Sequence, residues 1–156
     1  MLRTQTLTSM LVVACAIAGT AGCDGDSAFD PDAVVLQSFE GTLNIPASSV
    51  AVVAIQVDQT GTLRSVVDWN NFINDLDSAL LQGTCTANQI ILGTTPGCPN
   101  HDALVQETAT ALGFDDNQVR KPSTFDTPIT PGAYTLVVWN FSMFQNEVFF
   151  YRLEVI

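Results

Sequence analysis

The chain has 156 residues, enough for a leader followed by one domain that can bury a core without a metal or many disulfides. It carries 5 Lys and Arg against 16 Asp and Glu, a formal net charge of −11 at pH 7, which excludes nucleic acid and anionic lipid headgroups as general partners and is compatible with Ca²⁺. Only 13% of the residues are charged, so the acidic balance does not come from a disordered acidic tail.

Residues 1–22 have the three parts of a bacterial export signal. Arg3 supplies a positive start, residues 11–18 form an apolar run too short to span a bilayer, and small residues follow. The sequence TAGC at 20–23 resembles a lipobox, the motif in which the cysteine is lipidated and becomes the mature N-terminus. We therefore predict a lipoprotein-type signal peptide over these residues and a lipid anchor on Cys23.

Two alternatives stay open for this region. The sequence VVAC at 12–15 also fits a lipobox, with Cys15 modified, but cleavage there would leave only a short apolar segment interrupted by threonines. A plain signal peptide with an incidental cysteine is the other alternative. With Cys23 lipidated, residues 23–38 are a flexible tether. We then expect an exported protein whose lipid anchors it to the outer or the cytoplasmic membrane of the bacterial cell envelope, with no spanning segment.

Strands are predicted next along the chain. Residues 39–45 alternate apolar and polar side chains, and Pro46 ends that strand. Residues 50–57, VAVVAIQV, are apolar on both faces, which predicts a central strand. The stretch 61–84 contains a strand, a turn rich in Asn and Asp, and a second strand, which predicts a hairpin.

A long loop and an edge strand follow. Residues 82–102 are rich in Gly and Pro and predict a loop with a short strand at 90–92. The composition of residues 103–112 allows a helix, but their Thr content favours irregular or extended structure. Residues 118–126 predict a strand near an edge, because Pro122 lies inside it.

The clearest strands are the last two, at 133–140 and 147–156, and the sequence FSMFQN between them predicts a hairpin. No internal repeat or low-complexity tract interrupts the pattern. Seven or eight short strands without a long helix predict an all-β domain over residues 39–156, a single β-sandwich or jelly roll of mostly antiparallel strands.

Four motifs in this domain resemble the bacterial pre-peptidase C-terminal domain family. They are the strand that ends at Asp68, the NDLD block at 74–77, the PGAY sequence at 131–134 and the closing strand at 151–155. The resemblance covers residues 39–156. It implies a β-sandwich linked to substrate adhesion, secretion or stability, with calcium bound in some members. Because these motifs are structural, they imply the fold more than the function.

Two features depart from the family pattern. The strand after the NDLD block is SALL at 78–81, where the family commonly has an apolar and aromatic sequence such as LYL. Family domains usually follow a secreted peptidase or other hydrolase, and no hydrolase domain accompanies this one in the 156 residues. We therefore expect an accessory role that is separate from an enzyme.

Carboxylates and amides cluster at the predicted turn of the 61–84 stretch. Asp75 and Asp77 are two residues apart, so on a strand they share one face. Together with Asp68 and Asn74 they offer the oxygen ligands of a Ca²⁺ site. No EF-hand or other metal spacing is present, so we favour side chains that stabilise the turn by bonding to its backbone, with calcium as the alternative. No other cofactor is expected.

Cys85 and Cys98 both lie in the predicted loop. In an exported protein they predict a disulfide, which would close a 14-residue loop and stabilise the fold by about 3 kcal/mol. The alternative is a metal site of these cysteines with His101 and Asp102, but that set is one soft ligand short of a structural zinc site. Outside such a site, His101 is expected to be a solvated loop histidine.

Aromatic residues in the last two strands raise the question of an exposed binding surface. If one face of each strand is core, the opposite faces carry Trp139, Val137, Phe150 and Val148, which could form an apolar patch that binds a polysaccharide or a protein partner. Large aromatic residues are more often buried, so we favour the alternative that both faces are covered and these residues are core. Trp69 has the same two interpretations.

The sequence has no catalytic signature. Neither a GxSxG nor an HExxH motif is present, the only histidine is His101, and its pairing with Cys98 would remove the disulfide. The NDLD carboxylates lie too close on one strand for a paired-carboxylate hydrolase. We predict a non-enzymatic envelope lipoprotein that acts as a binding, adhesion or accessory module. The alternatives are a purely structural envelope protein, a docking subunit of a secreted hydrolase and, last, a hydrolase itself.

Overall fold

The computed structural model describes residues 33–71, 73–107, 109–116 and 121–156. The predicted signal peptide, Cys23 and most of the tether lie outside the described residues. The strands are β1 (Gln37–Ile45), β2 (Ser49–Val57), β3 (Gly61–Trp69), β4 (Leu76–Gln82), β5 (Gly113–Asp115), β6 (Ser123–Ile129), β7 (Gly132–Asn140) and β8 (Glu147–Val155), and the helices are α1 (Ala87–Leu92) and α2 (His101–Val105). Neither helix of the described ranges has the length and apolar character of a bilayer-spanning segment.

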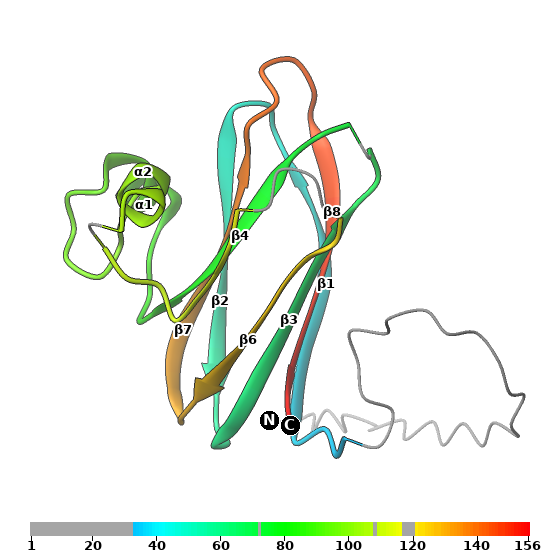
Figure 1. Cartoon of the computed structure of the whole chain (residues 1–156), viewed down its shortest axis with the longest axis vertical. Helices are drawn as coiled ribbons and strands as arrows, with labels where there is room; N and C mark the ends of the chain where they lie inside the picture. Colours follow the sequence, from blue (N-terminus) through cyan, green and yellow to red (C-terminus); the bar gives the residue numbers. More distant parts are fainter. Residues whose placement is uncertain (1–32, 72, 108, 117–120) are drawn as a thin grey trace, which may run out of the picture.

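The strands form two antiparallel sheets that pack face to face. The first sheet has the strand order β1-β8-β3-β6 and the second has the order β2-β7-β4-β5 (Figure 1). The predicted all-β sandwich is thereby confirmed. β6 lies at an edge, as predicted. Residues 118–120 of the predicted strand lie outside the described residues, and β6 begins after Pro122 and contains Pro128.

Alternation along the strands sets the buried interface between the sheets. β8 turns Phe149 and Leu153 inward, and β7 turns Leu136 and Val138 inward, as a period of two predicts. The same core contains Ile45, Ile55, Val57, Leu63, Val67, Trp69, Leu76, Leu80, Ile129, Tyr134 and Val155. Burial of each large aliphatic or aromatic side chain stabilises the fold by about 1.5–3 kcal/mol.

The two predicted hairpins are both connections between the sheets, so these two predictions are wrong. β3 and β8 belong to the first sheet, whereas β4 and β7 belong to the second. The two connections meet at one end of the sandwich, where Asn71 Nδ2 donates to Gln145 Oε1 and Asn74 Nδ2 donates to Glu147 Oε2, both at 2.6 Å. Alternation identifies the buried face of a strand but not its neighbour, which is why the sequence pattern suggested hairpins.

β2 is an edge strand and not the predicted central strand. Its two apolar faces have different coverings. Ile55 and Val57 lie in the core between the sheets, whereas Val50 and Val52 pack against a second apolar cluster beneath a helical insert. The covering insert, and not a central position, explains why this strand is apolar on both faces.

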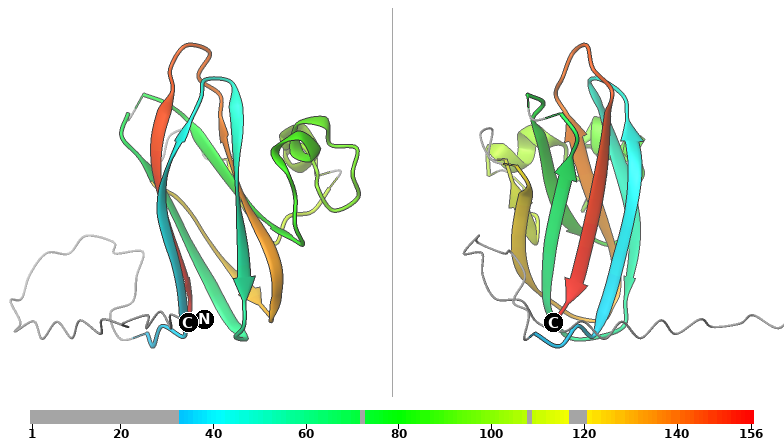
Figure 2. Two further views of the ribbon diagram at one scale, coloured as in Figure 1. Left: turned by 180° about the vertical axis from the view of Figure 1, so that it is seen from behind. Right: turned by 90° about the vertical axis from the view of Figure 1, so that its right-hand side faces the viewer.

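The helical insert, residues 83–112, lies on the outer face of the second sheet (Figures 1 and 2). α1 begins with a capping box, in which Thr86 Oγ1 accepts from the Gln89 N–H and the Gln89 side chain accepts from the Thr86 N–H. The predicted short strand at 90–92 is therefore wrong. α2 occupies the start of the 103–112 segment, and residues 106, 107 and 109–112 beyond it are irregular.

The second apolar cluster fills the space between the insert and the sheet. It contains Ala79, Leu81, Cys85, Ile90, Cys98, Leu104, Val137 and Trp139. The predicted disulfide between Cys85 and Cys98 is confirmed and lies within this cluster. Packing of the insert against β4 and β7 brings together side chains that are far apart in the sequence.

Candidate functional site

A histidine–aspartate pair lies where the insert meets the second sheet. The Asn100 side-chain oxygen accepts from the Ala103 N–H at 2.9 Å, and this cap places His101 at the first position of α2. Asp77 lies on β4, opposite Trp139 of β7. His101 Nε2 is 2.5 Å from Asp77 Oδ2, and the two side chains are 18% and 4% exposed. The prediction of a solvated histidine is wrong, because the insert folds His101 onto β4.

Aromatic rings surround the imidazole of His101. The ring centroids of Phe141, Trp139 and Phe114 lie 4.5, 5.3 and 5.8 Å from its centroid. Tilted and edge-on ring contacts of this kind each stabilise by about 0.5–1.5 kcal/mol. They shield the His101–Asp77 hydrogen bond from water and hold the imidazole in one orientation.

Carboxylates gather on the aspartate side of this pair. Burial raises the pKa of Asp75, and repulsion by Asp77, Asp115 and Asp116 adds to the rise, while His101 opposes it. With a raised pKa the folded protein binds this proton more tightly than the unfolded chain, so stability falls as the pH rises from the unfolded to the folded pKa of Asp75. Asp77 Oδ1 is also buried and has no hydrogen-bond partner among the described residues.

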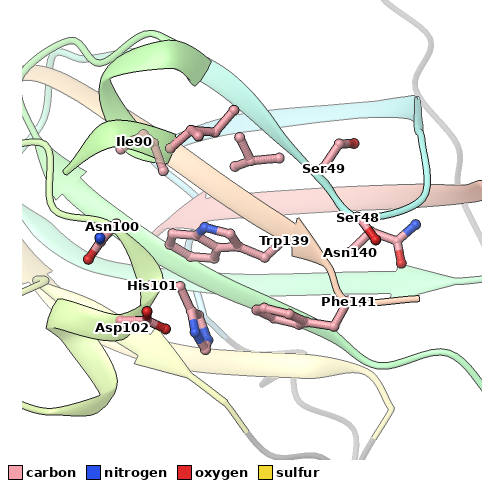
Figure 3. A pocket seen from close by; sticks show the side chains of 11 residues that line it. Ser48, Ser49, Ile90, Asn100, His101, Asp102, Trp139, Asn140 and Phe141 are labelled. Carbon is pink, nitrogen blue, oxygen red and sulfur yellow. The ribbon is translucent and has the colours of Figure 1, made fainter. Parts of the chain in front are cut away.

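A recess of about 290 Å³ opens beside the pair, between the insert and the end of β7. The rings of Trp139, His101 and Phe141 lie next to one another in it (Figure 3). Its polar rim is formed by Ser48, Ser49, Asn100 and Asp102, and α1 contributes Ile90 and Ile91. The recess therefore combines aromatic and aliphatic walls with hydroxyl, amide and carboxylate groups.

The structure does not bring together the residues of the calcium alternative. Asp68 pairs with Lys121 Nζ at 3.3 Å, and Asn74 donates to a buried glutamate, whereas Asp75 and Asp77 belong to the carboxylates beside the insert. In the part of the chain that the structure describes, no group of three or more His, Cys, Asp or Glu side chains is arranged to hold a metal ion. Asp68 and Asn74 are bonded to other partners and so are separated from the two carboxylates beside the insert.

The predicted aromatic patch is divided between opposite faces of the sandwich. Val137 and Trp139 lie on the outer face of the second sheet, where the insert buries them. Val148 and Phe150 lie on the outer face of the first sheet, each 40% exposed. The patch is therefore wrong as a single surface, because β7 and β8 belong to different sheets.

Sequence reasoning did not single out Phe141, the most exposed ring of the recess. A signal was available in FSMF at 141–144, which places two phenylalanines and a methionine in a connection where turn formation requires none of them. The polar residues Ser48, Ser49 and Asn100 carry no such signal. Ser48, Ser49 and Asn100 are ordinary loop and capping residues until the fold places them around one hollow.

The His101–Asp77 pair matches only part of a hydrolytic triad. In a triad, an aspartate orients a histidine that activates a nucleophile bonded to it. Among the described residues, no serine, threonine or cysteine side chain forms a hydrogen bond with His101. The Cys85–Cys98 disulfide also removes the thiolates that the alternative metal site requires. The arrangement can hold a ligand against its rings and polar rim.

Comparisons with known proteins give a likeness of fold. No protein-family model and no curated protein matches the chain. Among solved structures, it is similar to the mitogen derived from Yersinia pseudotuberculosis, with 14% identity over 77% of this chain and 86% of that chain and a TM-score of 0.48. It is also similar to the pre-peptidase C-terminal domain of the collagenase from Bacillus anthracis, with 15% identity over 77% of this chain and 88% of that chain and a TM-score of 0.43. Neither likeness carries an argument about function.

Proposed function

We propose that this chain is a non-enzymatic lipoprotein of the bacterial cell envelope whose β-sandwich acts as a binding or adhesion module. The observation that carries the proposal is the recess beside His101, in which aromatic rings meet a polar rim. Ligand sites commonly combine apolar walls with a few polar groups that fix the orientation of the ligand. A module that is anchored to the envelope and binds a ligand in this recess would attach the cell surface to that ligand.

The ligand class that we propose for the recess is a polysaccharide. A sugar ring has a face of C–H groups, which packs against an aromatic ring, and hydroxyl groups around its edge. Phe141 offers the exposed aromatic ring, and the hydroxyl, amide and carboxylate groups of Ser48, Asn100 and Asp102 offer hydrogen-bond partners. A recess of about 290 Å³ suits one sugar ring of a longer chain.

Replacing Phe141 by alanine is expected to weaken polysaccharide binding about tenfold, because truncation of a contact aromatic commonly removes more than about 1 kcal/mol. The measurement is the retention of the purified exported chain on peptidoglycan, chitin and cellulose. Phe150→Ala is the matched control, since Phe150 is 40% exposed against 44% for Phe141 but lies on the first sheet. A wild-type chain that none of these polysaccharides retains, or an equal loss in both variants, would contradict the proposal.

Palmitate labelling in the producing cell tests the proposed anchor. We expect the wild-type chain and the Cys15→Ser variant to be labelled and the Cys23→Ser variant to lose the label, because the thiol of the mature N-terminal cysteine receives the lipid. Label that persists in Cys23→Ser would move the anchor to Cys15 or elsewhere. Absence of label in the wild-type chain would leave a plain export signal.

A further inference from the structure

Large apolar side chains stand exposed at one end of the sandwich, and we name Ile73, Phe141, Met143 and Phe144 the apical surface. Ile73 belongs to the connection between β3 and β4, and the other three belong to the connection between β7 and β8. Ile73, Met143 and Phe144 are 78%, 73% and 87% exposed. Single exposed apolar residues are ordinary, but a group of them marks an interaction site.

A hollow of about 380 Å³ lies between the two connections. Ile73, Phe141 and Phe144 give it apolar walls, and Asp75 contributes a carboxylate. Phe141 separates this hollow from the recess beside His101, which it also lines. The hollow has room for a large side chain, and its lining offers both apolar contact and negative charge.

Hydrogen bonds hold the β7–β8 connection in one shape. Ser142 Oγ accepts from the Gln145 N–H at 3.0 Å, Gln145 Oε1 accepts from Asn71 Nδ2, and the buried Glu147 carboxylate accepts from the Asn74 amide. The apolar side chains are therefore carried on a fixed frame. A partner would not have to order this loop on binding, which lowers the entropic cost of association.

We propose that the apical surface docks a basic and apolar segment of another protein. Charge decides between this occupant and two others, a second copy of the chain and an anionic membrane. The chain has a formal net charge of −11, so a second copy or an anionic lipid surface would meet a charge of the same sign. A Lys or Arg side chain placed in the hollow beside Asp75 would instead offset the repulsion from the neighbouring Asp77, Asp115 and Asp116.

The apical surface lies at the end of the sandwich away from the start of β1 and the end of β8, which pair with each other (Figure 1). With a lipid anchor at the N-terminus, the tether would enter beside Gln37, and the apical surface would face away from the membrane. This orientation rests on the proposed function, whereas the docking itself does not. The expected partner is therefore a protein that approaches from the side facing away from the membrane that holds the anchor.

A phage library of random peptides of about 12 residues, long enough to cover a single groove, tests the proposal. The library is first depleted on the Met143→Ser/Phe144→Ser double variant and then selected on the wild-type chain. We expect the enriched peptides to combine Lys or Arg with aromatic or aliphatic residues. By fluorescence anisotropy, their Kd should rise about tenfold on the double variant and should also rise between about 50 and about 300 mM NaCl.

Matched variants separate the apolar and the charged parts of the surface. Phe150→Ser removes an exposed ring from the first sheet and should leave peptide binding unchanged. Asp75→Asn should weaken the binding of a basic peptide a few-fold. A control peptide in which every Lys and Arg is replaced by Ser should bind the Asp75→Asn variant and the wild-type chain equally well. Because Met143 and Phe144 are exposed, the double variant should melt within about 2 °C of the wild-type chain.

Four results would overturn the docking proposal. They are enrichment of peptides without basic residues, failure to recover a peptide that depends on the apical surface, a dimer in sedimentation that the double variant abolishes, and binding to anionic lipid vesicles that the double variant abolishes. The last two would identify a second copy or a membrane as the occupant. A wild-type chain that none of the polysaccharides retains would refute the proposed function alone, because that assay depends on the recess and not on Met143 or Phe144.

Discussion

Replacing His101 by alanine is expected to lower the free energy of unfolding by about 1–3 kcal/mol, because it leaves the buried Asp77 carboxylate without its hydrogen-bond partner. The Asp77 side chain is 4% exposed, and its Oδ1 atom already has no partner among the described residues. Without the imidazole, both carboxylate oxygens would be buried and unpaired. The rings of Phe141, Trp139 and Phe114 would also lose their shared contact. Urea unfolding at neutral pH measures the difference.

Two further variants separate the His101–Asp77 pair from the helix that carries His101. Asp102→Ala changes an exposed neighbour in the first turn of α2 and should alter stability by less than about 1 kcal/mol. The Asp77→Ala/His101→Ala double variant should lose less than the sum of the two single losses, since it leaves no unpaired charge. An additive double variant, or a His101→Ala loss no larger than that of Asp102→Ala, would show that the pair is not coupled.

Removal of the disulfide is expected to destabilise the chain by about 3 kcal/mol on the chain-entropy model. Cys85 and Cys98 are 13 residues apart and both are buried in the second apolar cluster, so Cys85→Ala/Cys98→Ala removes the cross-link without burying new polar atoms. The comparison is urea unfolding of the oxidised wild-type chain, the double variant and the reduced wild-type chain. The two chains without the cross-link should agree.

The loss should be concentrated in the insert. Amide hydrogen exchange should accelerate over α1 and α2, whereas β3 and β8, buried in the first sheet, should keep their protection. Equal stability of the double variant and the oxidised wild-type chain would mean that packing against Val137 and Trp139 holds the insert without the cross-link. Uniform acceleration across both sheets would mean that the insert and the sandwich unfold as one unit.

The sequence predicted those features that depend on short-range pattern. Alternation over 133–140 and 147–156 located β7 and β8 and sorted their side chains onto two faces, of which the structure makes the face with Phe149, Leu153, Leu136 and Val138 the core face. The period of side chains along a strand is a local property, so it can be read without knowing the neighbouring strands. The disulfide was likewise predictable, because Cys85 and Cys98 lie in one loop of a chain for which the sequence also predicts export.

The pairing of strands could not be read in the same way. The 61–84 stretch looks like a hairpin, yet the side chains of Asn71 and Asn74 bond to residues 74 and 73 positions further along the chain. Residues 50–57 look like a central strand, yet they form an edge that the insert covers. In both cases the missing information is a long-range contact, which alternation does not encode.

By itself, the sequence determined an acidic chain with an all-β domain and a disulfide in its main loop, since composition, period and cysteine spacing are local quantities. Only the tertiary structure decided which functional side chains lie next to one another. His101 and Asp77 are 24 residues apart and meet because α2 packs on β4. Ile73 and Phe144 come from connections that meet only when the two sheets close. Burial and charge act through space, so an expected loop histidine is hydrogen-bonded to a buried aspartate, and an expected turn carries an exposed apolar surface.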